Sequence, residues 1–189
     1  MAVNNKQEDI LNAALKMFAL RGYDGTTIPM IADEANVGAG TIYRYFENKQ
    51  TLVNSLFQNS VRTFSDALRS DFPVEGDMRQ KFAHIFRRMG EFAEQYTETL
   101  LFIDATAGSY YLDEKSNEMF QEFMSFIEHQ LDIGKKEGKI RNMPSKAMIS
   151  IVYGAFVQLF KVKCNGMLEA TPELMKAVEE SCWDAIRMH

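Results

Sequence analysis

The residues best suited to chemistry in this chain lie close together, between Asn36 and Lys49. Two glycines, Gly38 and Gly40, flank an alanine, and a threonine, two tyrosines, an arginine and a lysine follow them. Backbone N–H groups beside glycine, hydroxyls and cationic side chains are the groups with which proteins bind phosphate. The segment therefore raises three possibilities: a loop that holds a nucleotide, a helix that lies on DNA, or a tight turn between packed helices that binds nothing.

A nucleotide-binding loop does not fit these glycines. The dinucleotide loop follows a β-strand and has a third glycine three residues after the second, but Tyr43 occupies that place and the preceding residues have a helical pattern. The phosphate-binding loop of nucleoside triphosphatases ends in Gly-Lys-Ser/Thr, and no such ending follows here.

The residues after the turn favour DNA over an empty turn. At helical spacing Val37, Ile42 and Phe46 face inward. The outward and flanking faces are left to Ala39, Thr41, Tyr43, Arg44 and Tyr45. A helix of about two turns with small residues at its start fits the major groove, where an arginine binds guanine through two hydrogen bonds. Arg44 is therefore the candidate base-reading residue.

Helices must position this segment, because no stretch sustains the two-residue alternation of a half-buried strand. Thr27 is a natural N-cap for a short second helix, and Pro29 falls in its first turn, where a missing N–H costs little. Asn48 is a natural cap for a longer helix that runs to about Arg69. The other predicted helices span residues 5–21, 39–46, 78–96, 98–111, 113–136, 145–164 and 172–188. The chain is therefore predicted to be all-α.

The bulk composition is that of a globular protein of ordinary core size: 189 residues, of which 46% are hydrophobic and 25% charged. The net charge of -5 is unusual for a nucleic-acid binder, but it is unevenly distributed. Residues 1–70 hold seven basic and seven acidic side chains, so the acidity belongs to the rest of the chain. No apolar run reaches the roughly 20 residues of a membrane span and the N-terminus lacks a signal-peptide pattern, so we expect a cytoplasmic protein without membrane contact.

Catalytic and metal sites receive no support from the sequence. Cys164 and Cys182 are too few and too far apart for a disulfide framework or zinc site, so they are expected to be reduced thiols. His84 and His129 have no partners at metal-ligand spacing, and no nucleophile, base and acid form a recognisable set. We expect no enzyme activity, no metal and no cofactor.

The first 55 or so residues resemble the DNA-binding domain of TetR/AcrR-type transcriptional regulators, a bacterial family. The matching residues are Ile10, Ala13, Ala14, Phe18, Gly22, Tyr23, Thr26, Thr27, Ile31, Ala32, Ala35, Val37, Gly40, Thr41, Ile42, Tyr43, Tyr45, Phe46, Lys49 and Leu52. The resemblance implies a helix-turn-helix domain over residues 1–55, joined by a connector helix to a helical effector-binding and dimerisation domain over residues 56–189.

The resemblance also implies roles for single residues. Thr27 would touch the DNA backbone, Tyr43 would grip a phosphate, and Lys49 would anchor the far side. Thr41, Arg44 and Tyr45 would face bases or adjacent phosphates, Gly40 would allow close approach, and Ala39 could offer only apolar contact. Gly38 and Asn48 stand where the family often has serine, so one hydroxyl that binds the DNA backbone is missing.

In the second part, the resemblance implies a pocket for a largely apolar small molecule and a homodimer made by the last two helices. Residues 71–189 contain 10 of the 14 phenylalanines and 9 of the 12 methionines, which suit such a pocket or an ordinary core. Candidate pocket residues are Phe86, Met89, Phe102, Asp104, Tyr110, Phe123 and Met124; Asp104 could instead cap a neighbouring helix. Candidate dimer residues are Ile151, Ala155, Gln158, Leu174, Val178, Ser181 and Ala185, although packing within one chain would use the same pattern.

The predicted function is that of a homodimeric transcription regulator, a repressor that a small molecule releases from a palindromic double-stranded DNA operator. Two other classes stay open at this point. One is a small-molecule-binding protein or enzyme that retains the helix-turn-helix, and the other is a helical module that binds a protein through the aromatics after Gly40.

Overall fold

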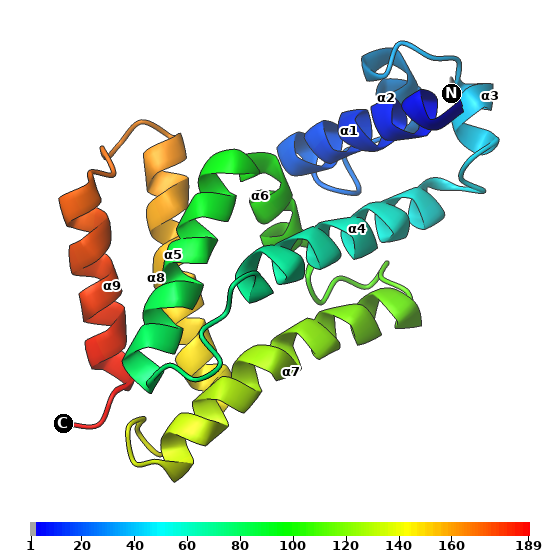
Figure 1. The fold of residues 1–189 in the computed structure, drawn as a ribbon. Helices are drawn as coiled ribbons and strands as arrows, with labels where there is room; N and C mark the ends of the chain where they lie inside the picture. The colour runs from blue at the N-terminus through cyan, green and yellow to red at the C-terminus, as the bar shows by residue number, and fades with distance from the viewer. Residues whose placement is uncertain (1–2) are drawn as a thin grey trace. The chain divides into compact units, whose positions relative to one another are not determined.

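The structure, a computed structural model, describes residues 3–189, with side chains from Lys6 onward. Residues 1 and 2 of the predicted N-terminal domain lie outside the described residues. The described chain is helical throughout, with one isolated β-bridge, so the predicted all-α fold is confirmed (Figure 1). Its helices are α1 (Val3–Arg21), α2 (Ile28–Glu34), α3 (Ala39–Tyr43), α4 (Lys49–Arg69), α5 (Met78–Gln95), α6 (Thr97–Thr106), α7 (Glu114–Lys136), α8 (Ser145–Cys164) and α9 (Pro172–Ile186).

The helix starts follow the predicted capping residues. The hydroxyl of Thr27 accepts a hydrogen bond from the Met30 N–H, and Pro29 lies in the first turn of α2. The side chain of Asn48 accepts from the Thr51 N–H at 2.8 Å at the start of α4. At the end of α1, Gly22 adopts a φ of 69°, a left-handed conformation that glycine adopts without a steric penalty.

Three helices end two or more residues earlier than predicted. Helix α3 ends at Tyr43 instead of Phe46, because the next turn tightens and the Tyr45 N–H bonds to the Ile42 carbonyl. Helix α6 ends at Thr106 instead of Tyr111, since Ala107 leaves the helical conformation and Gly108 follows with a φ of 77°. Helix α9 ends at Ile186, because Arg187 is extended and pairs with Ile140 in the isolated bridge.

The chain divides into two compact units. The N-terminal unit contains the residues up to Ala67 together with Glu94–Phe123, and the C-terminal unit contains Leu68–Ala93 and Met124–His189. Helix α6 and the first half of α7 thus belong with the helix-turn-helix. These compact units are not divided at residue 55, and the predicted domain boundary there stays a prediction.

Aromatic side chains build the core of the N-terminal unit around α6. Phe102 is 1% exposed and stacks on Phe18 of α1, with ring centroids 6.1 Å apart. The same ring meets Phe57 of α4 edge to face. One phenylalanine of α6 therefore contacts both the first helix and the connector helix.

The C-terminal unit has its own core at the ends of its helices. Met78, Leu131, Ile140, Met148 and Ile186 form one buried cluster. The backbone closes over it, because the Arg141 N–H donates to the Ile186 carbonyl at 2.9 Å and the Met188 N–H donates to the Lys139 carbonyl at 2.9 Å. The end of α9 is thereby fixed to the loop after α7.

Both cysteines are free thiols, as predicted. Cys164 is exposed, whereas Cys182 is buried in α9. Burial raises the pKa of the Cys182 thiol above its ordinary value, because the charged thiolate loses hydration, so this sulfur is protonated at neutral pH.

Candidate nucleic-acid interface

The predicted helix-turn-helix is formed by α2, α3 and the turn between them. Asn36 in that turn has a φ of 53°, a left-handed conformation that asparagine tolerates better than most residues. The Val37 N–H donates to the Ala32 carbonyl at 2.9 Å, which closes the end of α2. Gly38 then serves as the N-cap of α3 in extended conformation, without a side-chain bond. The turn is therefore as short as the glycine and asparagine pattern predicts.

Helix α3 buries one face and leaves the other open. Ile42 is fully buried and Phe46, just after the helix, is 3% exposed, as predicted. On the other face Tyr43 is 55% exposed, and Gly40 and Arg44 are also exposed. Ala39, Thr41 and Tyr45 are half-buried at the flanks. The candidate base-reading and phosphate-binding side chains are thus available on one surface.

Gly40 has open space where a side chain would be. Beyond the neighbouring residues and the backbone of the same helix, a Cβ at Gly40 would meet no atom within 4 Å, and the same holds for Gly38. Internal packing of the chain therefore does not explain why these positions are glycine. The open space is compatible with close approach of another molecule to the backbone, and that approach stays a prediction.

Thr27 is exposed at the start of α2, where its hydroxyl oxygen accepts from the Met30 N–H at 3.4 Å. Because that bond uses the oxygen as acceptor, the hydroxyl hydrogen stays available to a phosphate. The geometry is compatible with the predicted backbone contact, which stays a prediction.

Lys49 lies differently from what its predicted role requires. Its ammonium donates to the carbonyls of Tyr23 at 2.8 Å and Thr26 at 2.9 Å, and stands 4.0 Å from the centroid of the Tyr23 ring. An ammonium has three N–H donors, so at most one is left for a phosphate. Lys49 fastens the start of α4 to the loop between α1 and α2, and its phosphate contact stays a prediction.

We expect Lys49→Ala to lower the free energy of unfolding by about 2 kcal/mol, because two carbonyls lose a charged donor. Urea denaturation measures this change. The control is Lys16→Ala, which removes an ion pair to Glu34 with a 2.6 Å contact and a half-exposed lysine, and should cost less than about 1 kcal/mol. Equal stability losses in the two variants would contradict the anchoring role.

Tyr23 connects this loop to the segment after α6. Its ring stacks on Tyr111 with centroids 4.0 Å apart and planes inclined by 18°. Desolvation by burial is the largest cause that raises the pKa of Tyr23, and the nearby Asp24 carboxylate raises it further, so the phenol stays neutral. The loop between α1 and α2 is thus held by a cation on one side and an aromatic ring on the other.

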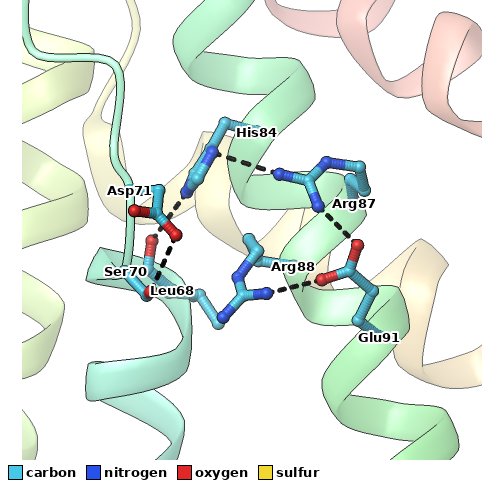
Figure 2. Close-up of polar contacts among 7 residues, drawn as sticks. All are labelled: Leu68, Ser70, Asp71, His84, Arg87, Arg88 and Glu91. Atoms are coloured by element: carbon cyan, nitrogen blue, oxygen red, sulfur yellow. Dashed lines mark hydrogen bonds and ion pairs between the residues drawn. The ribbon is translucent and has the colours of Figure 1, made fainter.

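The last turn of α4 is fixed in the C-terminal unit by a histidine (Figure 2). The Nε2 of His84 lies 3.2 Å from the Leu68 carbonyl oxygen, and Nη2 of Arg87 lies 3.4 Å from Nδ1. A guanidinium only donates, so Nδ1 accepts and Nε2 carries the hydrogen that bonds to Leu68. Arg87 and Arg88 both pair with Glu91 on α5. His84 therefore caps the end of α4. Among the described residues, no cluster suitable for a metal ion occurs.

The residues predicted to line an effector pocket are divided between the two units. The N-terminal unit contains Phe102, Asp104, Tyr110 and Phe123, and the C-terminal unit contains Phe86, Met89 and Met124. The four phenylalanine and methionine side chains Phe86, Met89, Phe102 and Phe123 are buried, and Asp104 and Met124 are half-buried. Tyr110 is 79% exposed and donates to the Asp24 carboxylate at 2.9 Å, which does not fit the wall of an apolar cavity. The pocket itself stays a prediction.

Helices α8 and α9 lie side by side (Figure 1). Part of their apolar surface is exposed. Ile151 is 41% exposed, and Gly154, Ala155 and Gln158 on the same face of α8 are exposed too. Between Val3 and His189, α8 is the one helix that is long and apolar enough to cross a membrane, judged by length and composition alone. Only 22% of its most apolar stretch is buried inside the chain. Packing within the chain therefore does not account for this face.

The α9 residues of the predicted dimer set are less exposed. Ser181 is exposed, whereas Leu174 and Val178 are half-buried. Ala185 is also half-buried and packs against the cluster around Ile140 and Ile186, so its position is explained by the core of its own unit.

Comparison with known proteins places this architecture in a family. Residues 10–56 match the family model described as bacterial regulatory proteins of the tetR family, and residues 57–188 match the tetracyclin repressor-like C-terminal domain. The chain belongs to the TetR family. It is a DNA-binding transcriptional regulator of that family, which confirms the resemblance found in the sequence.

Among TetR-family relatives, the uncharacterized HTH-type transcriptional regulator YhgD of Bacillus subtilis is 31% identical over 147 residues, 75% of this chain and 74% of YhgD. A TetR family regulator from Shewanella sp. PV-4 has the same fold, with a TM-score of 0.81 at 22% identity over 97% of this chain and 99% of that one. The regulator FadR from Bacillus subtilis, solved in complex with stearoyl-CoA, gives a TM-score of 0.72 at 19% identity over 96% and 99% of the chains.

Proposed function

We propose that the chain is a homodimeric repressor that binds a pseudo-palindromic operator with two copies of α3 and leaves it when a small molecule binds. The open face of α3 carries this proposal: Gly40, Tyr43 and Arg44 are exposed together, while Ile42 is buried behind them. A dimer places two such helices in successive major grooves, one helical turn of DNA apart. The protein acts by binding equilibria and not by catalysis, in the cytoplasm where bacterial DNA lies.

Each outward residue has a role of its own. Arg44 reads a base, and the hydroxyl of Tyr43 binds a phosphate. Thr27 contacts the backbone from the start of α2, Thr41 and Tyr45 bind at the flanks of α3, and Ala39 makes apolar contact. Gly40 lets the first turn of α3 approach the sugar-phosphate chain.

Replacement of Gly40 by alanine should change the stability of the fold and the affinity for the operator in opposite directions. A methyl group at Gly40 would meet no atom within 4 Å beyond its neighbouring residues and the backbone of its own helix. Because alanine is better than glycine inside a helix, Gly40→Ala should raise the free energy of unfolding by about 0.5–1 kcal/mol. The same methyl group should weaken operator binding severalfold, because it faces the DNA. Thermal denaturation and fluorescence anisotropy on labelled duplexes measure the two effects.

The matched control is Gly90→Ala in α5, where an added Cβ also meets nothing within 4 Å. It should stabilise the protein in the same way and leave operator affinity unchanged. Unchanged operator affinity in Gly40→Ala would mean that the backbone at Gly40 does not approach DNA.

The effector is proposed to be largely apolar, in view of the aromatic and methionine side chains of residues 71–189. Stearoyl-CoA is the first probe, because the FadR relative binds it. A tenfold loss of operator affinity on effector binding requires about 1.4 kcal/mol of coupling between the two sites. Titration of a preformed operator complex with stearoyl-CoA, with coenzyme A alone as the control, measures that coupling.

The test of operator binding is a selection of random duplex DNA on the purified protein, followed by affinity measurements at several salt concentrations. A palindromic motif with a steep loss of affinity as salt rises supports the proposal, because phosphate contacts release counterions. The absence of an enriched motif would overturn it.

A further inference from the structure

Three amide side chains of α4 lie on one face of the helix, at a spacing of four residues. They are Gln50, Asn54 and Gln58, and side chains four residues apart on a helix are neighbours. All three donate hydrogen bonds to the α6–α7 junction, which we define as residues 107–116. Gln50 donates to the Tyr111 carbonyl at 3.1 Å, and Gln58 donates to the Ser116 hydroxyl at 3.0 Å. We name these three side chains the amide ladder.

Asn54 is the central and most buried member, with 3% exposure. Its Nδ2 donates to the carbonyl of Tyr111 at 2.9 Å and to that of Gln50 at 2.8 Å. Its Oδ1 accepts from the Asp113 N–H at 2.8 Å and from the Ser116 hydroxyl at 2.7 Å. An amide has two donors and two acceptor positions, so Asn54 uses its full capacity.

The ladder also completes the start of α7. The side chain of Asp113 caps this helix by accepting from the Ser116 N–H at 2.8 Å. In a capping box, the third helical residue would return a bond to the backbone N–H of the capping residue. That residue here is Ser116, which is fully buried and donates to Asn54 instead. Asn54, on another helix, accepts the backbone N–H of Asp113 in its place.

Apolar packing already holds α4 against α6 and α7. Phe57 of α4 contacts Phe102 of α6, and Phe64 of α4 contacts Phe123 of α7. Aromatic packing tolerates small slips and rotations, whereas a fully satisfied buried polar network admits one geometry. The network therefore fixes the rotation and axial position of α4 on the α6–α7 junction. Because Lys49 ties the start of α4 to the loop before α2, the same constraint reaches the helix-turn-helix.

We propose that the amide ladder Gln50, Asn54 and Gln58 positions the recognition helix for operator binding by locking α4 to the α6–α7 junction. The proposal rests on the operator binding proposed above. The ladder residues touch no DNA in this proposal; they act through α4. They are therefore positioning residues. Ser116, which belongs to the C-terminal family domain, helps to fix the position of the DNA-binding surface through its bond to Asn54.

The experiment uses the full-length protein with Asn54→Ala, Ser116→Ala, the Asn54→Ala/Ser116→Ala double variant and the Gln50→Ala/Gln58→Ala double variant. The control is Asn59→Ala, an exposed asparagine on the same helix. Affinities for the selected operator and for an unrelated duplex are measured at one salt concentration, after circular dichroism and size-exclusion chromatography establish folding and oligomeric state.

We expect Asn54→Ala to weaken operator binding at least tenfold while binding to the unrelated duplex changes less than twofold. Ser116→Ala should weaken operator binding by a smaller factor in the same selective manner, and the Asn54→Ala/Ser116→Ala double variant should be no worse than Asn54→Ala alone. The Asn59→Ala control should match the wild type. A role in folding only would leave the ratio of the two affinities unchanged in folded protein.

Unchanged operator affinity, or equal losses on both duplexes, would overturn the proposal. If Asn54→Ala does not fold, the Gln50→Ala/Gln58→Ala double variant is tested by the same ratio of operator affinity to affinity for the unrelated duplex. This variant should fold, because Gln50 is exposed and Gln58 is half-buried. Failure of the wild type to select any operator would instead contradict operator binding itself, and the ladder proposal with it.

Discussion

Arg44→Ala is expected to weaken binding to the selected operator by about 1–3 kcal/mol, roughly 5- to 150-fold, and to relax the choice of base at one position of each half-site. In the proposed complex, the variant loses the bidentate contact of Arg44 to guanine. Arg44 is exposed at the end of α3, while the apolar side of this segment is held by Ile42 and Phe46. The substitution should therefore leave the free energy of unfolding within about 0.5 kcal/mol of the wild type.

The comparison with Tyr43→Phe separates base contact from phosphate contact. Loss of the Tyr43 hydroxyl should weaken binding to all duplexes about equally, because a phosphate carries no sequence information. Anisotropy titrations on the operator, on operators changed at single positions and on an unrelated duplex give both results. Arg62→Ala, an exposed arginine on α4 outside the recognition segment, is the control for loss of a positive charge.

Equal losses for Arg44→Ala on every duplex would make Arg44 a phosphate contact. The salt dependence would then confirm that reassignment, since each lost phosphate contact lowers the slope of log affinity against log salt by about one. The base-reading role would pass to Thr41 or Tyr45, which flank the same helix.

The parts of the structure that the sequence predicted well are those that depend on neighbouring residues. Thr27 and Asn48 cap the next helical turn, within three residues of themselves, so their roles are readable from local sequence. The inward position of Ile42 follows from helical spacing in the same way. The regulatory family was recognisable for the same reason, because the helix-turn-helix is a local motif.

The parts that the sequence did not reveal depend on partners far along the chain. The ammonium of Lys49 bonds to carbonyls 26 and 23 residues earlier, which no local pattern indicates. The amides of α4 bond to residues 57–62 positions later. Their spacing of four residues is visible in the sequence, but polar residues on the solvent-facing side of an amphipathic helix have the same spacing. The partners could be known only from the fold.

The uncovered face of α8 leads to the second large expected effect. Within one chain, this face of the apolar helix α8 is exposed at Ile151, Ala155 and Gln158. In the proposed dimer, the same face of a second copy covers it. The sequence alone left packing within one chain as an equal alternative. The exposure of Ile151 and Ala155 within the chain favours the dimer.

Ala155→Glu should therefore convert the protein to a monomer, because a dimer would bury an unpaired carboxylate on each side of its twofold axis. Size-exclusion chromatography with light scattering should give half the mass of the wild type. Operator affinity should fall by a factor of 10² to 10⁴, since the two recognition helices then bind as separate molecules instead of as a linked pair. The monomer should remain folded, because Ala155 is exposed within the chain.

Ala105→Glu is the matched control, an identical change at an exposed alanine on α6. It should leave both the mass and the operator affinity unchanged. A dimeric Ala155→Glu protein that binds its operator normally would show that another surface joins the two copies. A monomeric wild type would contradict the proposed dimer itself. A monomeric Ala155→Glu protein with weakened operator binding supports the α8 face as the link between the two recognition helices, because neither Ala155 nor its helix carries a group that binds DNA in the proposed complex.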